Sequence, residues 1–214
     1  LTMHGDSLSA VYDVFGRLEA RGDGRFTRDD GSQFNTVNLY PGSSLRLDYN
    51  MDVNDSMLIS RLDNSNLGLE TDENKWGDTT GMTLRGATLY LVSSNTRQNQ
   101  ERIGAMTVEQ GAAVLLERTG TNGQMVLSTP SITRVGQATF DVRENADELG
   151  RVDLQGQKFF IDNGASMLDA QNMLPAWMIN PSRNTFLTYN ASFGVQNKAF
   201  TQNSGAVGTG AAFL

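Results

Sequence analysis

Apolar and polar residues alternate in short runs along this chain, and the runs recur in one layout. Residues 45–49 and 140–142 show the alternation clearly, which places every second side chain on one face of a β-strand. The layout is an apolar residue, a polar one, an apolar one, a glycine shortly afterwards, and then a second alternating run. Six copies of this layout begin at Leu1, Val37, Met82, Met106, Ile132 and Val152.

Each copy predicts a short strand, a glycine-centred corner and a second short strand. Glycine permits the positive φ or the close approach that a corner requires. Gly86, Gly111 and Gly136 lie 25 residues apart, and a repeat of roughly 20–25 residues is typical of one coil of a parallel β-solenoid. The sequence therefore predicts an all-β fold, with residues 1–214 forming a single stacked-coil segment. A two-sheet β-sandwich is the structural alternative.

The polar residue at the second position of each copy should face outward. If the coils stack in register, these residues form one column on the surface, where neighbouring Thr side chains are mildly favourable. The predicted column consists of Thr2, Asn38, Thr83, Thr107, Thr133 and Asp153. Glycines in the equivalent corner positions of the remaining copies are Gly5, Gly42 and Gly156.

Two regions depart from the repeat. Residues 48–81 contain no clean copy and predict a loop-rich insertion, which costs little when it leaves the stack at a corner. Near the end, apolar residues have nearly helical spacing, but Pro175 and Pro181 argue against a long helix, so we predict an extended, irregular strand there. The apolar residues concerned are Met167, Ala170, Leu174 and Trp177.

Composition narrows the class of protein. Lys and Arg number 17 against 24 Asp and Glu, a net charge of −7, which argues against nucleic acid or an anionic membrane as the main partner. No run approaches the roughly 18 apolar residues of a membrane helix. Without cysteine, the fold must be held by packing and hydrogen bonds alone. From Leu1 at the start and the apolar residues at the end, we expect a segment of something longer.

Residues 101–112 resemble the E-x-I-G-x-L-T-L-x-x-G element of the autotransporter-associated β-strand repeat. The segment 174–177, followed by 186–190 and 194–195, looks like the stretch that closes a long block in those proteins; Ala176 replaces a Pro and Asn190 an Asp. The resemblance extends over residues 84–195. It implies a right-handed parallel β-helix within a larger repetitive protein, exported and displayed outside a bacterial cell as a passenger, stalk, adhesin or surface-layer material.

Three short motifs have both a functional and a structural interpretation. Residues 5–8 spell Gly-Asp-Ser-Leu, as in the nucleophile block of GDSL esterases, but His4 is the only histidine and the chemistry needs a base oriented by an acid. Residues 21–23 spell Arg-Gly-Asp between turn residues. Asp48, Asp52, Asn54 and Asp55 offer oxygen ligands for Ca²⁺ without the spacing of a calcium loop. The structural interpretation is preferred for each.

Acidic pairs and aromatic residues supply the remaining candidates. Paired carboxylates on neighbouring coils can hydrolyse glycosides, and the pairs here are Asp29–Asp30, Asp72–Glu73 and Asp147–Glu148. Exposed aromatic rings can stack on sugars, and the candidates are Trp76, Tyr40, Tyr49 and Tyr90. Solvated turns and core packing are the structural interpretations of these two sets.

Taken together, the sequence predicts a non-enzymatic structural segment of an exported bacterial surface or fibrous protein. We assign no catalytic, cofactor-binding or metal-binding residues, and no cofactor. Expected partners are neighbouring repeats of the same protein and further copies in an oligomer or filament, with no nucleic acid and no membrane insertion. One alternative is an adhesin module that binds a glycan or a receptor; another is a polysaccharide-cleaving β-helix enzyme.

Overall fold

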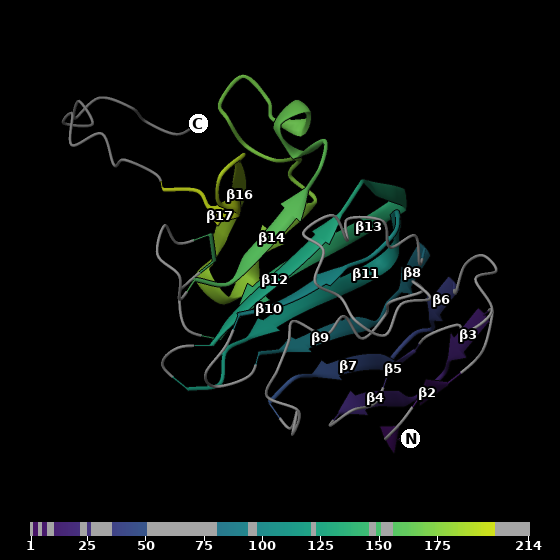
Figure 1. Cartoon of the computed structure of the whole chain (residues 1–214). Helices are drawn as coiled ribbons and strands as arrows, with labels where there is room; N and C mark the ends of the chain where they lie inside the picture. The colour runs from purple at the N-terminus through teal and green to yellow at the C-terminus, as the bar shows by residue number, and fades with distance from the viewer. Residues whose placement is uncertain are drawn as a thin grey trace, which may run out of the picture.

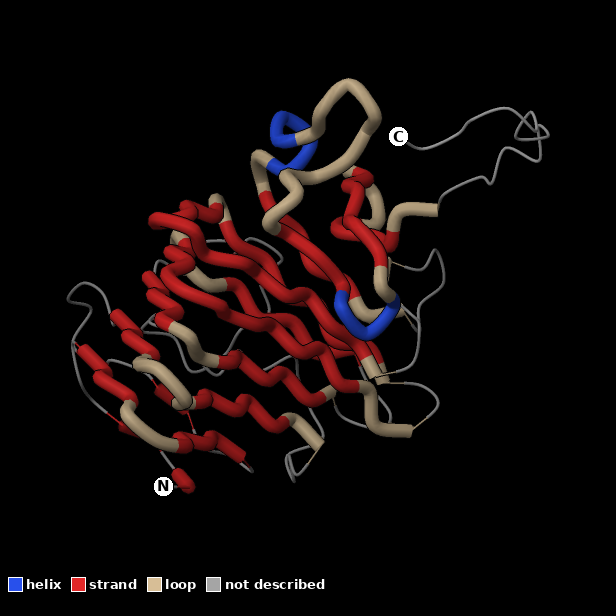
Figure 2. Tube along the Cα trace, turned by 180° about the vertical axis from the view of Figure 1, so that it is seen from behind, coloured by secondary structure: helices blue, strands red, loops and turns tan. Residues whose placement is uncertain are grey.

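The chain folds as an all-β protein whose sheets are mostly parallel (Figures 1 and 2). The computed structural model describes residues 2–3, 6–7, 11–21, 25–26, 36–50, 81–93, 98–120, 123–145, 149–150 and 156–199. Among these residues the strands form one large sheet and two smaller ones, and the helical segments are two short 3₁₀ turns.

The large sheet has twelve strands in the described residues. They are β1 (Thr2–Met3), β3 (Val11–Val14), β4 (Arg17–Arg21), β6 (Thr36–Leu39), β7 (Ser44–Asp48), β8 (Gly81–Arg85), β9 (Thr88–Val92), β11 (Met106–Glu117), β13 (Ile132–Glu144), β15 (Met178–Asn180), β16 (Thr185–Asn190) and β17 (Gly194–Asn197). The other two sheets are formed by β10 (Gln98–Arg102), β12 (Gln124–Thr129) and β14 (Lys158–Ile161), and by β2 (Asp6–Ser7) and β5 (Arg25–Phe26).

Every pairing from β1 to β15 is parallel among the described strands, which is not the pairing of an antiparallel sandwich. The order β3–β6–β8 continues into the first half of β11, and the order β4–β7–β9 continues into its second half. The large sheet therefore has two halves joined at a row of corners. The N-terminal strands lie at one end of the stack and β16 and β17 at the other (Figure 1).

The corners contain residues with positive φ, as the repeat predicts, but at one corner this residue is not the glycine that the repeat aligns there. Gly42, Gly86 and Gly136 have φ of 76°, 61° and 63°. In β11, however, the residue with positive φ is Gln110, at 62°, and not Gly111. The register shifts at this point, because Gly111 pairs with Thr139 after Glu109 has paired with Val135. Between these two pairs β11 has one residue, Gln110, whereas β13 has three, residues 136–138.

The predicted outer column exists over four of its members. Asn38 pairs with Thr83, Thr83 with Thr107, and Thr107 with Thr133. Thr2 is not in it: β1 joins the other half of the sheet, where Thr2 pairs with Glu19. Asp13 takes the place beside Asn38 instead.

The last copy of the repeat departs from the prediction as well. Its second run, β14, pairs with β12 in the smaller sheet and not with the large one, while Asp153 lies outside the described residues. In the predicted insertion, β7 ends at Asp48 and β8 begins at Gly81; residues 51–80 also lie outside the described residues.

The C-terminal region is not the extended strand that the spacing suggested. Met167 ends the 3₁₀ turn η1 (Gly164–Met167), and strand structure resumes only at Met178. Between them the Asp169 carboxylate accepts the backbone N–H groups of residues 171 and 173, which holds a tight turn. The 3₁₀ turn η2 (Pro181–Arg183) connects β15 to β16, which pairs antiparallel with β15 on one side and with β17 on the other.

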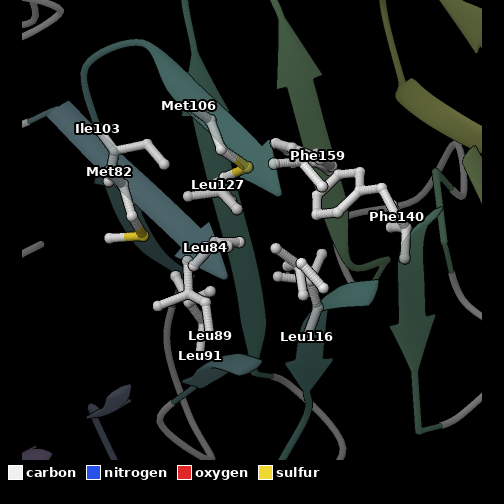
Figure 3. Packing of buried hydrophobic residues seen from close by; sticks show 14 of the residues in the cluster. Met82, Leu84, Leu89, Leu91, Ile103, Met106, Leu116, Leu127, Phe140 and Phe159 are labelled. Atoms are coloured by element: carbon white, nitrogen blue, oxygen red, sulfur yellow. The ribbon is translucent and has the colours of Figure 1, made fainter. Parts of the chain in front are cut away.

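The core lies between the large sheet and the β10–β12–β14 sheet (Figure 3). Inward residues of successive strands pair directly, as in the row of Leu89 and Val114 and the row of Leu91 and Leu116. Leu127 and Phe159 are contributed by the smaller sheet, and both are fully buried. The apolar core is therefore shared by successive strands of both sheets.

Candidate functional site

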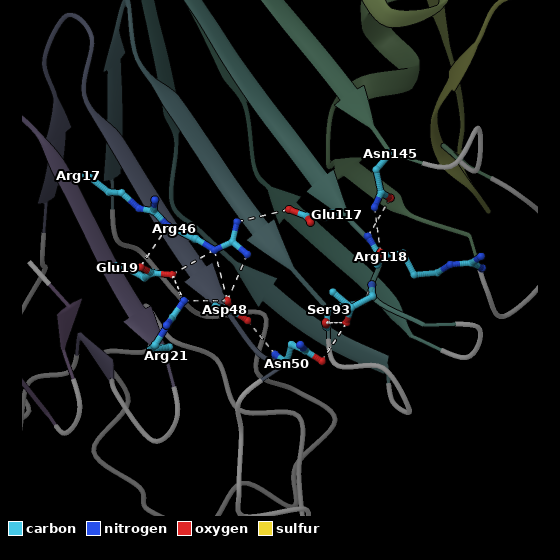
Figure 4. Close-up of polar contacts among 11 residues, drawn as sticks. Arg17, Glu19, Arg21, Arg46, Asp48, Asn50, Ser93, Glu117, Arg118 and Asn145 are labelled. Carbon is cyan, nitrogen blue, oxygen red and sulfur yellow. Dashed lines mark hydrogen bonds and ion pairs between the residues drawn. The ribbon is translucent and has the colours of Figure 1, made fainter.

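An ionic network covers the outer face of β4 and β7 (Figure 4). Arg46 is its centre: Nε lies 3.1 Å from Oε1 of Glu19, Nη2 lies 3.2 Å from Oδ2 of Asp48, and Nη1 lies 3.4 Å from Oε2 of Glu117. Glu19 and Arg46 are direct cross-strand neighbours. The strand register therefore brings the opposite charges together.

Two carboxylates of this network are almost fully buried, although they lie on the outer side of the sheet. Glu19 is 5% exposed and Asp48 is 4% exposed, and a buried carboxylate requires charged or hydrogen-bonding partners. Arg21 lies 2.7 Å from Glu19 and 3.7 Å from Asp48, and Arg17 lies 3.2 Å from Glu19. Asp48, one of the calcium candidates, is thus an ion-pair partner of Arg21 and Arg46.

Small polar side chains form a ladder just beyond the ends of β7, β9, β11 and β13. The Thr119 hydroxyl lies 3.1 Å from Oδ1 of Asn50 and donates to the Ser93 carbonyl at 2.6 Å. Beyond β13, the amide of Asn145 donates to the Arg118 carbonyl and accepts the Arg118 backbone N–H, both at 2.9 Å. These side chains satisfy backbone groups that the corner leaves without a strand partner.

Inside the stack, Glu101 is 1% exposed and accepts a hydrogen bond from the hydroxyl of Tyr49. Glu101 is the acidic residue of the E-x-I-G element, so that element places a carboxylate in the core. Tyr49 is fully buried, which contradicts its proposed role in an exposed aromatic platform. The alternation in residues 45–49 already put Tyr49 on the same face as Leu45 and Leu47, and that was the signal for its burial.

A second buried carboxylate, Glu144, lies at the end of β13. Glu144 continues the inward row after Leu116, and its Oε2 accepts Nδ2 of Asn180 at 2.7 Å while its Oε1 accepts Nε of Arg183 at 3.2 Å. Sequence reasoning missed this group. Its only signal was an acid at an inward position of an otherwise apolar run.

Tyr189 joins the C-terminal hairpin to β14. Its hydroxyl donates to the Ile161 carbonyl at 2.7 Å and lies 3.3 Å from the Ile161 nitrogen. Burial raises the pKa of the Tyr189 phenol above its usual value, because the charged phenolate is disfavoured away from water.

One exposed aromatic residue, Phe15, lies at the corner that follows β3. Phe15 is 73% exposed and its ring stacks on that of Tyr40, with centroids 4.2 Å apart and planes 16° from parallel. Tyr40 was a sequence candidate, whereas Phe15 was not. Tyr90 is half-buried between Arg46 and Leu115 in register.

The other sequence candidates fall mainly in parts of the chain that the structure does not describe. Of residues 4–8, the structure describes only the backbone of β2. Arg21 binds Glu19, while the remaining residues of its tripeptide lie outside the described ranges. So do Trp76, the three acidic pairs and the rest of the calcium candidates, namely Asp52, Asn54 and Asp55.

The described residues contain neither a cluster of metal ligands nor a membrane-spanning helix. Among them, His, Cys, Asp and Glu side chains form no group of three or more placed to hold a metal ion. Within the same residues there is no helix with the length and apolar character needed to span a bilayer.

Comparison with known proteins does not identify the chain. It matches no protein-family model, no curated protein and no solved structure.

Proposed function

We propose that the chain is a non-enzymatic structural segment, a rigid right-handed parallel β-helix that acts as a stalk or scaffold in a longer repetitive protein. The observation that supports this most directly is the parallel ladder of equivalent positions. Asp13, Asn38, Thr83, Thr107 and Thr133 occupy one column through consecutive pairings. Their separations along the chain are 25, 45, 24 and 26 residues, three of them close to one coil.

The contacts between coils supply the stiffness that a stalk requires. Backbone hydrogen bonds run along the stack, the inward rows bury a continuous apolar core, and the Arg46 network ties β4 and β7 to β11 on the outside. Each coil is therefore stabilised by its neighbours, which is the energetic pattern of a repeat protein. A lateral force on one coil is shared by several strands.

The resemblance of residues 101–112 to the autotransporter-associated repeat supports placement outside a bacterial cell. The absence of cysteine from the sequence is compatible with export as an unbridged chain. In this proposal the partners are neighbouring repeats of the same protein and further copies that extend or bundle the rod.

Electron microscopy of the native particle tests the proposal. We expect an elongated rod, sheath or filament whose long axis is much greater than its width, since coils add length at about 4.8 Å each. A compact, isolated particle of a size expected for a monomeric globular enzyme would contradict a scaffold role.

A further inference from the structure

We propose that the first corner of the stack binds a neutral linear glycan. The site is the Phe15 patch, defined here as Asp13, Phe15, Asn38 and Tyr40, which lies on β3, β6 and the corners that follow them. It is a property of the outer surface and does not depend on the scaffold role proposed above.

The aromatic part of the patch is held open to solvent. Phe15 keeps 73% of its surface exposed even though one face of its ring stacks on Tyr40. Tyr40 is fixed from the following strand by Arg85, whose guanidinium carbon lies 5.2 Å from the ring centroid, and Arg85 is held in turn by Glu109 at 2.8 Å. This arrangement presents a flat apolar ring in a fixed orientation, and an aromatic face attracts polarised C–H groups.

The polar part of the patch offers hydrogen-bond acceptors beside that ring. Oδ1 of Asp13 accepts Nδ2 of Asn38 at 2.9 Å and the Tyr40 hydroxyl at 3.5 Å. In the described part of the chain, Oδ2 of Asp13 and Oδ1 of Asn38 have no hydrogen-bond partner. A ligand that fits must combine donors with an apolar face, which is the chemistry of a pyranose ring with its hydroxyl groups.

The column beyond the patch favours a polymer over a basic peptide. From Asn38 it continues through Thr83, Thr107 and Thr133, which are uncharged donors and acceptors repeated about every 4.8 Å along the stack. The charges of the adjacent column are already paired as Arg85 and Glu109. Within the described residues of this column a basic peptide would meet one carboxylate, that of Asp13, which already accepts Asn38 and Tyr40. A chain of hydroxyl-bearing units would instead meet matching groups on each successive strand.

The test measures binding of the full chain to immobilised β-1,4-glucan, β-1,3-glucan, xylan, mannan and galactan oligosaccharides, with oligo-arginine and oligo-lysine as a separate arm. We expect binding to at least one oligosaccharide. Phe15→Ala and Asp13→Ala should each weaken it by about tenfold or more, in line with loss of a central aromatic or polar contact. Phe15→Trp, which keeps an aromatic face, should retain it.

The matched control is Phe186→Ala, because Phe186 is also exposed, at 41%, and belongs to β16 at the other end of the stack. It should leave glycan binding unchanged, and circular dichroism should show that each variant keeps the wild-type fold. The proposal is overturned by silence across all five oligosaccharides, by binding that Phe15→Ala does not weaken, or by Phe15-dependent binding to the basic peptides alone.

Discussion

The Arg46 network provides the sharpest test of how neighbouring strands of the large sheet are held together. Arg46→Met removes the guanidinium and keeps most of the aliphatic stem. Its contacts with three carboxylates, Glu19, Asp48 and Glu117, at 3.1–3.4 Å, are lost. Hydrogen bonds to charged groups contribute about 1.5–3 kcal/mol each, but Arg17 and Arg21 still reach Glu19. The expected loss is therefore about 2–4 kcal/mol, below the simple sum.

The assay is urea denaturation followed by far-ultraviolet circular dichroism, with Arg143→Met as the control. Arg143 lies in the same outer column, but its side chain is 43% exposed and its partner Asp141 is on its own strand. An exposed pair contributes about 0–1 kcal/mol. Arg46→Lys should be intermediate, since one ammonium cannot span three carboxylates. Equal losses for Arg46→Met and Arg143→Met would refute the reasoning.

Three further predictions concern the corners and the buried polar groups. Gly194→Ala should destabilise the fold far more than Gly42→Ala. Both glycines have φ of 76°, but a Cβ at Gly194 would lie 2.3 Å from a backbone carbonyl oxygen of β14, whereas a Cβ at Gly42 would have nothing within 4 Å. Similar thermal midpoints for the two variants would contradict this. Tyr49→Phe removes a donor from the buried carboxylate of Glu101 and should cost about 1–3 kcal/mol in urea unfolding, so an unchanged midpoint would argue against the pair. Because burial raises the pKa of Tyr189, the stability that its phenol contributes is present below about pH 10 and is lost as pH rises further. Tyr189→Phe should remove this part of the alkaline loss of stability in a series of unfolding measurements at different pH. An identical alkaline profile for the variant would contradict the assignment to Tyr189.

Local pattern was sufficient for the strands of the middle coils. Alternation in residues 45–49 gives the inward and outward faces, and the spacing of Thr83, Thr107 and Thr133 gives their shared column. These features are readable because side-chain direction along a strand has a period of two residues, whatever the strand pairs with.

Only some residues of the aromatic patch and of the Arg46 network could be identified from the sequence. The sequence singled out Tyr40, and Phe15 is recognisable only beside it, because their stacking joins two coils. Tyr49 was one of four aromatic candidates for a sugar platform, and its burial agrees with the core-packing interpretation and with its position in the alternating run. The ion pairs of Arg46 likewise join strands that are distant in the sequence, the contact with Glu117 across 71 residues.

By itself, then, the sequence determined the all-β character, the glycine-rich corners and the faces of the strands, because each depends on a residue and its immediate neighbours. Which strand lies beside which was decided by the tertiary structure. Thr2 pairs with Glu19, and β14 pairs with β12. The residue with positive φ in β11 is Gln110, and β16 pairs antiparallel with β15. The physical reason is that strand pairing satisfies backbone hydrogen bonds between segments far apart in the chain. Several partners can satisfy those bonds equally well, and the choice among them rests on the packing of the whole core.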